Sequence, residues 1–147
     1  MRKFLIAALA ALAGGAALVV SAPAAEAREA KVYKNPQCGC CQEHADYLRE
    51  NGFEVAVEPT HGLAMMNRMA GIPEGMAGCH LTFVGDYVVS GHVPVETIER
   101  LLEQKPAIKG ITLPGMPMGS PGMGGEKQAP FTIYEIGAGE PTVYAVE

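Results

Sequence analysis

The sequence predicts one α/β domain, and three patterns carry that prediction. Polar and apolar residues alternate with a period of two over 53–58, as in a half-buried strand. Just before this run, Cys41, Ala45 and Leu48 recur at the spacing of an apolar helix stripe. Further on, two short apolar runs are joined by Gly85-Asp86, which favours a tight hairpin. The chain of 147 residues has room for one such domain.

The expected elements follow one another in the order β-α-β-α-β-β-α. In chain order they are a strand over 30–35, a helix from the cysteines to Asn51-Gly52, a strand over 53–58, a short helix over 63–70, strands over 81–84 and 87–90, and a helix from Pro94 to Lys105. A cysteine motif between the first strand and the first helix makes this order typical of a thioredoxin-like domain.

Both ends of the chain depart from this pattern. Residues 1–27 have a basic start, an apolar run and the cleavage pattern Ala25-Glu26-Ala27, which predicts a secretory signal peptide. The alternative is a membrane anchor, but the apolar run of about 17 residues is at the lower limit for spanning a bilayer. The domain is therefore expected over 28–147. Within it, 110–130 is expected to be an irregular Met/Pro/Gly segment, and 131–146 a terminal hairpin around Gly137-Ala-Gly139.

Charge excludes one class of partner. Without residues 1–27 the chain has nine Lys and Arg against fifteen Asp and Glu, a net charge of about −6. A nucleic-acid-binding protein needs a basic face, and the sequence has none. After cleavage of the signal peptide, no segment is long and apolar enough for a membrane span.

Three of the four cysteines lie within four residues, as Cys38-Gly39-Cys40-Cys41. Disulfides inside this cluster would close very small rings, so it suits metal binding or redox exchange better than cross-linking. Cys38 and Cys41 have C-x-x-C spacing at a helix N-terminus, where thiolates are favoured. A dithiol oxidoreductase needs only those two sulfurs, whereas a metal site also uses Cys40. Sulfur-rich sites select Cu(I) and Zn(II), and the lack of a second C-x₂₋₄-C knuckle favours copper over zinc.

Other residues are candidates to complete the site. In a thioredoxin-like fold, Cys79 would lie opposite the helix N-terminus and supply a fourth sulfur, with His80 adding an imidazole; the alternative is a lone buried Cys beside a surface His. His44, one helical turn after the cysteines, is a candidate ligand, a partner of a ligand, or a solvated residue. His92 is expected to cap or pack at a helix start, with ligation as the alternative, and His61 to lie on the surface. Met66 and Met69 are expected in the core. Met116, Met118 and Met123 are expected to cover the cluster, or else to bind copper weakly.

The chain resembles the CopG-like family of small exported proteins associated with bacterial copper resistance. The matching segments are Cys38-Gly-Cys-Cys41, Asn51-Gly52-Phe53, Cys79-His80, Tyr87-Val-Val-Ser-Gly-His-Val-Pro94 and Pro114-Gly-Met-Pro-Met-Gly-Ser-Pro-Gly-Met123. The resemblance implies a thioredoxin-like domain that binds copper through the C-x-C-C cysteines and the later Cys79. The first helix departs from the family pattern, with His44 where Trp is common and Tyr47 where His is common.

The expected function is that of a periplasmic protein that holds Cu(I) with Cys38, Cys40, Cys41 and Cys79, together with His44 and His80. The cysteines could form a multinuclear thiolate cluster, used for copper resistance, for transfer to other periplasmic copper-handling proteins, or for Cu(I)/Cu(II) redox. The rival interpretation is a thiol–disulfide oxidoreductase that uses Cys38 and Cys41. A zinc or mercury site with the same ligands is a third.

Overall fold

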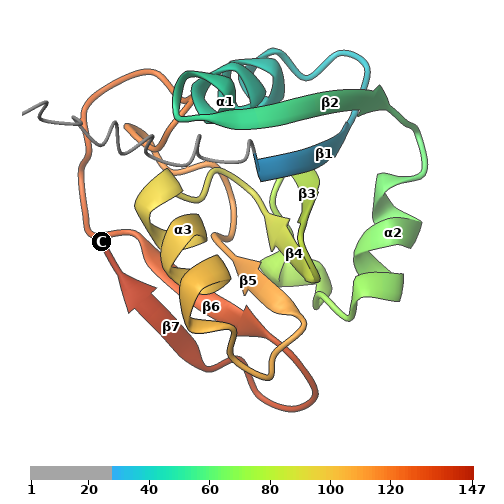
Figure 1. Cartoon of the computed structure of the whole chain (residues 1–147), viewed down its shortest axis with the longest axis vertical. Coiled ribbons are helices and arrows are strands. Elements are labelled where there is room, and N and C mark those ends of the chain that lie inside the picture. Colours follow the sequence, from blue (N-terminus) through green and yellow to red (C-terminus); the bar gives the residue numbers. More distant parts are fainter. Residues whose placement is uncertain (1–27) are drawn as a thin grey trace, which may run out of the picture.

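The computed structural model describes residues 28–147, so the expected signal peptide over 1–27 lies outside the described residues. These residues form one seven-stranded mixed sheet with three α-helices (Figure 1). The prediction of a single α/β domain is therefore confirmed. Within 28–147, no helix has both the length and the apolar character needed to cross a membrane.

The observed elements include all of those expected, together with one further strand and one short 3₁₀ helix. They are β1 (Arg28–Lys34), α1 (Gly39–Glu50), β2 (Phe53–Pro59), α2 (Leu63–Ala70), the 3₁₀ helix Glu74–Met76, β3 (His80–Val84), β4 (Tyr87–Ser90), α3 (Val95–Gln104), β5 (Gly110–Thr112), β6 (Thr132–Ile136) and β7 (Val143–Val146). The terminal hairpin is formed by β6 and β7, which pair antiparallel.

The strands lie side by side in the order β2-β1-β3-β4-β5-β6-β7. β1 and β2 are parallel because α1 connects them, and β4 and β5 are parallel because α3 does so. The β3–β4 hairpin turns through Gly85-Asp86, and Val84 pairs with Tyr87. Since β1 pairs antiparallel with β3, Lys34 at the end of β1 lies opposite His80 at the start of β3. This pairing brings the start of α1 close to the residues just before β3.

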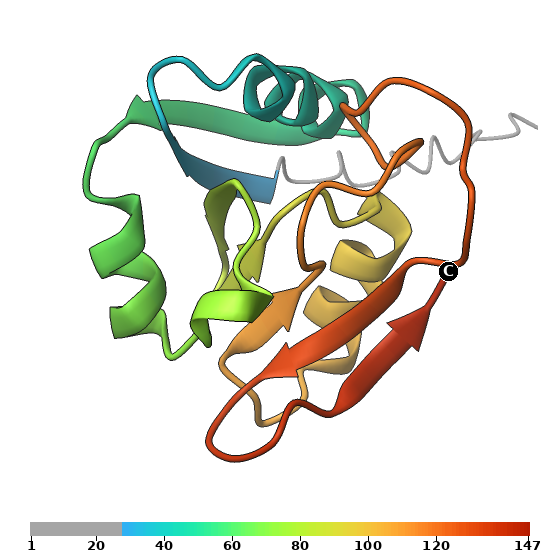
Figure 2. The same cartoon turned by 180° about the vertical axis from the view of Figure 1, so that it is seen from behind.

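The two faces of the sheet carry separate apolar cores. The larger core joins Leu48 of α1 and Ile98 and Leu101 of α3 to Val89 and Ile111 of the sheet. The smaller core is built on the other strand face by Ile72, Leu81 and Ile136, with α2 packed against it. Figures 1 and 2 show α3 against one face of the β4–β6 region, with the strands in front of it when the molecule is seen from behind.

The expected stripe of α1 is confirmed, since Cys41, Ala45 and Leu48 are all buried. The expectation for α2 was wrong in one residue. Met69 is 78% exposed, whereas Met66 and Ala70 pack against the smaller core. A helical period fits either Met69 or Ala70 on the same side as Met66, and the sheet against which α2 packs decides that Ala70 faces the core.

The segment expected to be irregular, 110–130, begins with the short strand β5. Gly110 allows this strand because a Cβ built there would lie 1.8 Å from the carbonyl oxygen of Val88 on β4. A three-residue strand that starts with glycine has too little alternation to be found by pattern. Beyond it, residues 113–131 contain no helix or strand. This part of the chain passes beside α1 before it enters β6 (Figure 1).

Candidate metal centre

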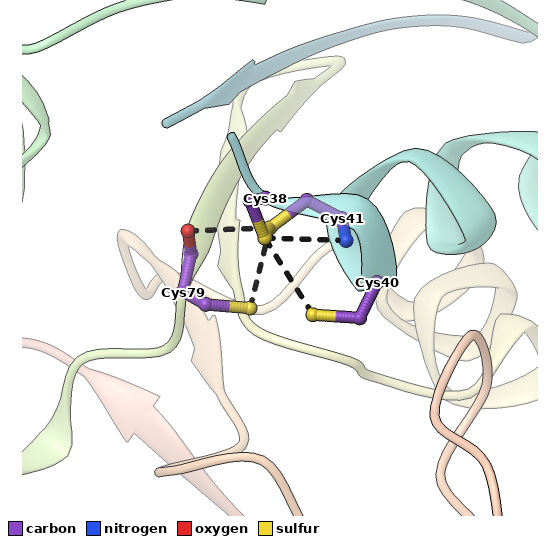
Figure 3. Close-up of side chains that lie close together, drawn as sticks. All are labelled: Cys38, Cys40, Cys41 and Cys79. Atoms are coloured by element: carbon purple, nitrogen blue, oxygen red, sulfur yellow. Dashed lines mark hydrogen bonds between the residues drawn. A yellow bond between two sulfur atoms is a disulfide. The ribbon is translucent and has the colours of Figure 1, made fainter. Parts of the chain in front are cut away.

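Four cysteine sulfurs meet at the N-terminus of α1. Cys38 is the N-cap residue, Cys40 and Cys41 lie in the first turn, and Cys79 immediately precedes β3. The Sγ atoms all lie within 4.8 Å of one another. Figure 3 shows the four side chains pointing toward one another. Cys41 is buried, and the other three are partly exposed. The structure thus brings together all four cysteines that the sequence singled out.

Two of these cysteines are joined in the structure. Cys38 and Cys41 form a disulfide, and Cys40 and Cys79 are free. The free sulfurs flank the bond, with Cys40 3.5 Å from Cys38 and Cys79 3.4 Å from Cys41. This bond is unexpected from the sequence, because it closes a small ring. Cys38 is extended at the N-cap, however, and its Cα lies 5.4 Å from that of Cys41, which is an ordinary disulfide separation.

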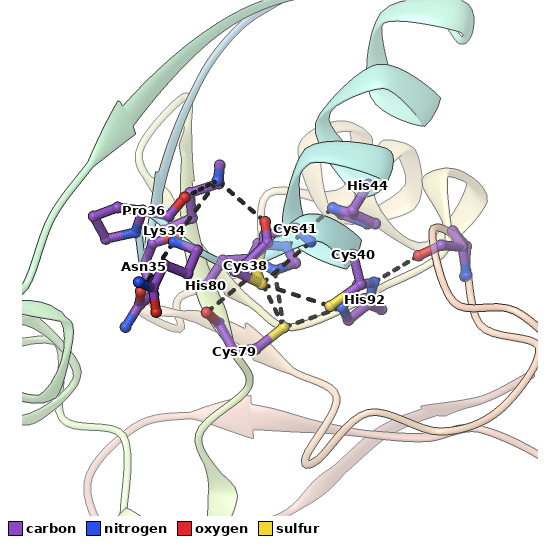
Figure 4. The surroundings of a disulfide bond; sticks show 12 residues. Lys34, Asn35, Pro36, Cys38, Cys40, Cys41, His44, Cys79, His80 and His92 are labelled. Atoms are coloured by element: carbon purple, nitrogen blue, oxygen red, sulfur yellow. Dashed lines mark hydrogen bonds between the residues drawn. A yellow bond between two sulfur atoms is a disulfide. The ribbon is translucent and has the colours of Figure 1, made fainter.

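A buried lysine supports the loop that carries Cys38. The side chain of Lys34 donates hydrogen bonds to the carbonyl oxygens of Asn35, Pro36 and Cys38, the last at 3.1 Å (Figure 4). Lys34 is 7% exposed, and no carboxylate of residues 28–147 forms an ion pair with it. Its positive charge lies at the carbonyl oxygen of Cys38, and the amide of Cys41 donates to the Cys38 sulfur at 3.3 Å; both favour a thiolate at Cys38 once the disulfide is reduced. Sequence patterns did not indicate Lys34.

Three buried histidines lie behind the sulfurs. The rings of His44, His80 and His92 are 0% exposed, and their centroids lie 4.7–5.3 Å apart. Cys79 Sγ is 3.4 Å from Nδ1 of His80 and 3.0 Å from Nε2 of His92. Cys79, His80 and His92 therefore form a second group whose ligand atoms lie within 4.8 Å of one another.

Of the histidines that the sequence offers as ligands, one lies beside the sulfurs and another does not. His80 lies beside the sulfurs, as expected. His44 does not reach them, because its Nδ1 is 3.0 Å from Nε2 of His80 and its Nε2 is 3.0 Å from the carbonyl oxygen of Val93. Tyr47, one turn further along α1, accepts a hydrogen bond from the amide of Val95. His61 is exposed, as expected.

His92 is the residue that sequence reasoning left outside the site. The predicted hairpin contained the signal that places it there. A two-residue turn at Gly85-Asp86 pairs Val84 with Tyr87 and Leu81 with Ser90, and the same register puts residue 79 opposite residue 92. The backbones meet closely at this point, since a Cβ on Gly78 would lie 2.3 Å from the Cα of Gly91.

Burial sets the protonation states of these groups. It lowers the pKa of His44 to about 4 and the pKa of His80 well below its ordinary value. Burial also lowers the pKa of His92, against the effect of the Pro121 carbonyl. The three imidazoles are therefore neutral at pH 7, the form that binds metals. Burial, followed by the charge of Cys40, raises the pKa of the Cys79 thiol to about 12. A metal that binds Cys79 must displace its proton.

The irregular segment covers the histidines through its backbone. The carbonyl oxygen of Pro121 lies 2.7 Å from Nδ1 of His92 and accepts its hydrogen bond. Gly122 lies so close to α1 that a Cβ there would be 2.6 Å from the amide nitrogen of His44. Met116 and Met118 are more than half exposed. Met123 is partly buried. Contacts of this segment with His92 and α1 are made by Pro121 and Gly122.

The chain is similar to one protein family and to two solved structures. A family model described as "Protein of unknown function, DUF411" matches residues 76–123, which include Cys79, His80 and His92. Two solved structures, titled "Copper resistance protein copG- Form 2" and "Form 1", each have a TM-score of 0.75 and 31% sequence identity to this chain. They cover 83% of it, and 99% and 98% of their own chains are matched. The chain belongs to the CopG-like copper-resistance family. No curated protein matches it in sequence.

Membership of the CopG-like family and the cysteine cluster together support a copper-related function. The cluster can hold a metal ion because its sulfurs converge from two parts of the chain. Cysteine thiolates with neutral imidazoles beside them form a donor set that suits ions such as copper and zinc.

Proposed function

We propose that the protein is a periplasmic copper-binding protein that holds Cu(I) with the thiolates of Cys38, Cys40, Cys41 and Cys79. The observation that carries this proposal is the convergence of the four sulfurs within 4.8 Å. Thiolates are soft ligands that select Cu(I), and sulfurs this close can bridge two or more ions. His80 Nδ1, beside Cys79 Sγ, adds a nitrogen ligand, and His92 Nε2 is placed to add a second.

Copper binding to all four cysteines requires the reduced protein. The Cys38–Cys41 disulfide must first accept two electrons and two protons, which a thiol reductant can supply. The two resulting thiols and the free thiols of Cys40 and Cys79 then lose their protons to the solvent as the metal binds. Cys38, Cys40 and Cys79 are partly exposed, which supports exchange of copper with other periplasmic copper-handling proteins. The same cluster supports resistance by sequestration, or Cu(I)/Cu(II) redox.

The test is Cu(I) titration of residues 28–147, fully reduced and under nitrogen, against a chromophoric Cu(I) chelator. The proposal expects the protein to retain copper, and expects Cys40→Ser to weaken retention at least tenfold. X-ray absorption of the loaded protein should show copper–sulfur scattering, with copper–copper scattering if the cluster is multinuclear. Absence of retention, or a Cys38→Ser/Cys40→Ser/Cys41→Ser triple variant that binds as the wild type does, would contradict it.

The periplasmic location is part of the proposal and has its own test. Export through the expected signal peptide should give a mature chain that begins at Arg28 when the whole gene product is expressed in a Gram-negative host. N-terminal sequencing of the periplasmic fraction measures this directly. A chain that keeps residues 1–27 in the membrane fraction would contradict the location and leave the copper site unaffected.

The Cys38–Cys41 disulfide favours a second candidate function, thiol–disulfide exchange. In this reaction the thiolate of Cys38 attacks a substrate disulfide, and Cys41 resolves the mixed disulfide, so that the substrate is reduced as the protein is oxidised. This candidate predicts metal-independent reduction of a model disulfide that Cys38→Ser abolishes and Cys40→Ser leaves unchanged. An inactive wild-type protein under these conditions would remove it.

A further inference from the structure

We propose that His44 is a positioning residue, which fixes the His80 ring in the tautomer whose bare Nδ1 faces the cysteine sulfurs. His44 itself binds no metal. This proposal rests on the proposed function, because it concerns how one nitrogen of the same site is presented. The observation that carries it is an unbroken chain of buried polar contacts from the Val93 carbonyl through both rings to Cys79.

The direction of every hydrogen bond in this chain follows from its first member. The carbonyl oxygen of Val93 can only accept, so Nε2 of His44, 3.0 Å away, carries a hydrogen and donates it. In a neutral imidazole the other nitrogen is then bare. Nδ1 of His44 therefore accepts a hydrogen bond from Nε2 of His80, at 3.0 Å. His80 in turn has a bare Nδ1, which lies 3.4 Å from the sulfur of Cys79.

The surroundings of the two rings support the neutral form. His44 and His80 are fully buried. Within residues 28–147, neither ring forms an ion pair or a hydrogen bond with a carboxylate. A charged imidazole at this depth would lack a compensating partner, which is costly. With both its nitrogens engaged by Val93 and His80, His44 has no atom left for a metal.

His92 also has a ring nitrogen without a hydrogen facing Cys79, but a backbone carbonyl fixes its tautomer. Its Nδ1 donates to the carbonyl oxygen of Pro121 at 2.7 Å, which leaves Nε2 bare and 3.0 Å from Cys79 Sγ. Two bare nitrogens thus point at one sulfur. The Cys79 thiol has a single hydrogen and can donate it to only one of them. The other nitrogen is left without a donor at this sulfur, and a cation bound beside Cys79 would satisfy both.

His92 is held by a backbone carbonyl, whereas His80 depends on a side chain. Loss of the acceptor at position 44 would free His80 Nε2 from its partner, and the ring could then move its hydrogen to Nδ1. A ligand imidazole whose other nitrogen loses its hydrogen-bond partner typically binds its metal 10–100-fold more weakly. His44 is therefore expected to affect copper binding without touching copper.

The experiment reads the tautomer directly. Reduced, metal-free protein labelled with ¹⁵N-histidine is examined by long-range ¹H–¹⁵N correlation, and His80 is expected as the Nε2–H form with a bare Nδ1. In His44→Phe, which has no acceptor, the Nδ1–H form should appear. His44→Asn places an amide oxygen near the position of Nδ1 and should restore the wild-type tautomer. His61→Phe, at the exposed histidine, is the matched control and should leave His80 unchanged.

Loading with Cu(I) gives the second readout. The ¹⁵N signal of His80 Nδ1 should shift, Nε2 should keep its hydrogen, and His44→Phe should lower the affinity about tenfold or more. A wild-type His80 that carries its hydrogen on Nδ1 would overturn the proposal, even if His44→Phe fails to fold. So would a His44→Phe variant with an unchanged tautomer. These outcomes are separate from the test of function, since a protein that keeps the wild-type His80 tautomer but retains no copper would contradict only the copper site.

Discussion

At the scale of the residue, the site combines groups that are each unfavourable to bury alone. Lys34 lies under the loop that carries Cys38, with its charge satisfied by three carbonyl oxygens. His44, His80 and His92 are buried as neutral rings. Buried polar groups persist where each finds a partner. The sulfur of Cys79 contacts both His80 and His92, so this residue links the cysteine cluster to the buried histidines.

Replacement of Lys34 by methionine tests the role of the buried charge. Lys34→Met keeps the length of the side chain but leaves the carbonyl oxygens of Asn35, Pro36 and Cys38 without its hydrogen bonds. The variant should lose about 1–3 kcal/mol of unfolding free energy. Its Cu(I) affinity should fall roughly tenfold, because thiolates beside a lost positive charge are harder to form. Urea denaturation and chelator competition measure the two effects.

Lys31→Met is the matched control for this change. Lys31 lies on the same strand, β1, but its side chain is about half exposed, in an ion pair with Glu58. Such pairs contribute little, so this variant should stay within about 1 kcal/mol of the wild type and bind copper normally. Equal effects of the two substitutions would show that a lysine charge on this strand, rather than the buried contacts of Lys34, is responsible.

At the scale of the element, two connections build the site. The β3–β4 hairpin register places His92 opposite Cys79, and Gly78 and Gly91 permit the close approach of their backbones. The segment over 113–131 has no regular structure, yet Pro121 and Gly122 dock it against His92 and α1. Gly122 has a φ of 79°, a conformation that favours glycine. The cover over the histidines therefore depends on Gly122, whose lack of a side chain lets this segment pack against the backbone of α1.

Substitution of Gly122 by alanine should lift this cover. The added Cβ would lie 2.6 Å from the amide nitrogen of His44 and 2.9 Å from the carbonyl oxygen of Cys40, and helix backbone cannot move aside. Together with the cost of a positive φ, the loss of stability should be about 2–4 kcal/mol. Limited proteolysis should then cut the 113–131 segment faster. The control is Gly124→Ala, where a Cβ meets nothing within 4 Å; equally fast cleavage of both variants would contradict a docking role for Gly122.

The sequence predicted the elements well wherever a pattern extended over several residues. Helix α1 was predictable because Cys41, Ala45 and Leu48 mark a stripe that is buried in the structure. Strand β5 was not, because it is three residues long, and its pairing depends on the close approach of Gly110 to β4. Met69 was placed in the core because helical period alone does not say which of two adjacent stripes faces the sheet. The thioredoxin-like arrangement stays a prediction.

The candidate site was predictable to the extent that its chemistry lies in short motifs. Cys38, Cys40 and Cys41 are neighbours in the chain, and Cys79-His80 stands out as a pair. His92 could have been found by extending the hairpin register. Lys34 could not, because burial of a lysine is a property of the folded loop around it. The position of His44 one turn from the sulfurs suggested a ligand, and only the contacts of both its nitrogens assign it a different place.

At the scale of the whole molecule, the histidines couple the site to the stability of the fold. They lie between α1, the β3–β4 hairpin and the covering segment, so that their burial depends on all three being in place. Each ring is neutral in the folded protein, and its pKa is lowered by burial. In the unfolded chain the same rings take up protons near their ordinary pKa of about 6.5. Acid therefore favours the unfolded chain.

The metal-free, oxidised protein should lose stability as the pH falls from 7 to 4.5. Well above pH 6.5 both states of His44 are neutral, and this residue adds no pH dependence; as the pH falls through 6.5 the unfolded chain binds a proton that the folded protein does not take up until about pH 4. The full difference is worth about 3 kcal/mol for His44, and His80 and His92 act in the same direction. Urea denaturation at several pH values across this range should show the loss. In His44→Phe, the slope of unfolding free energy against pH should fall by the equivalent of up to one bound proton. His61→Phe, at an exposed site, should keep the wild-type slope. A stability that stays constant down to pH 4.5 would mean that the histidines are not buried as neutral rings.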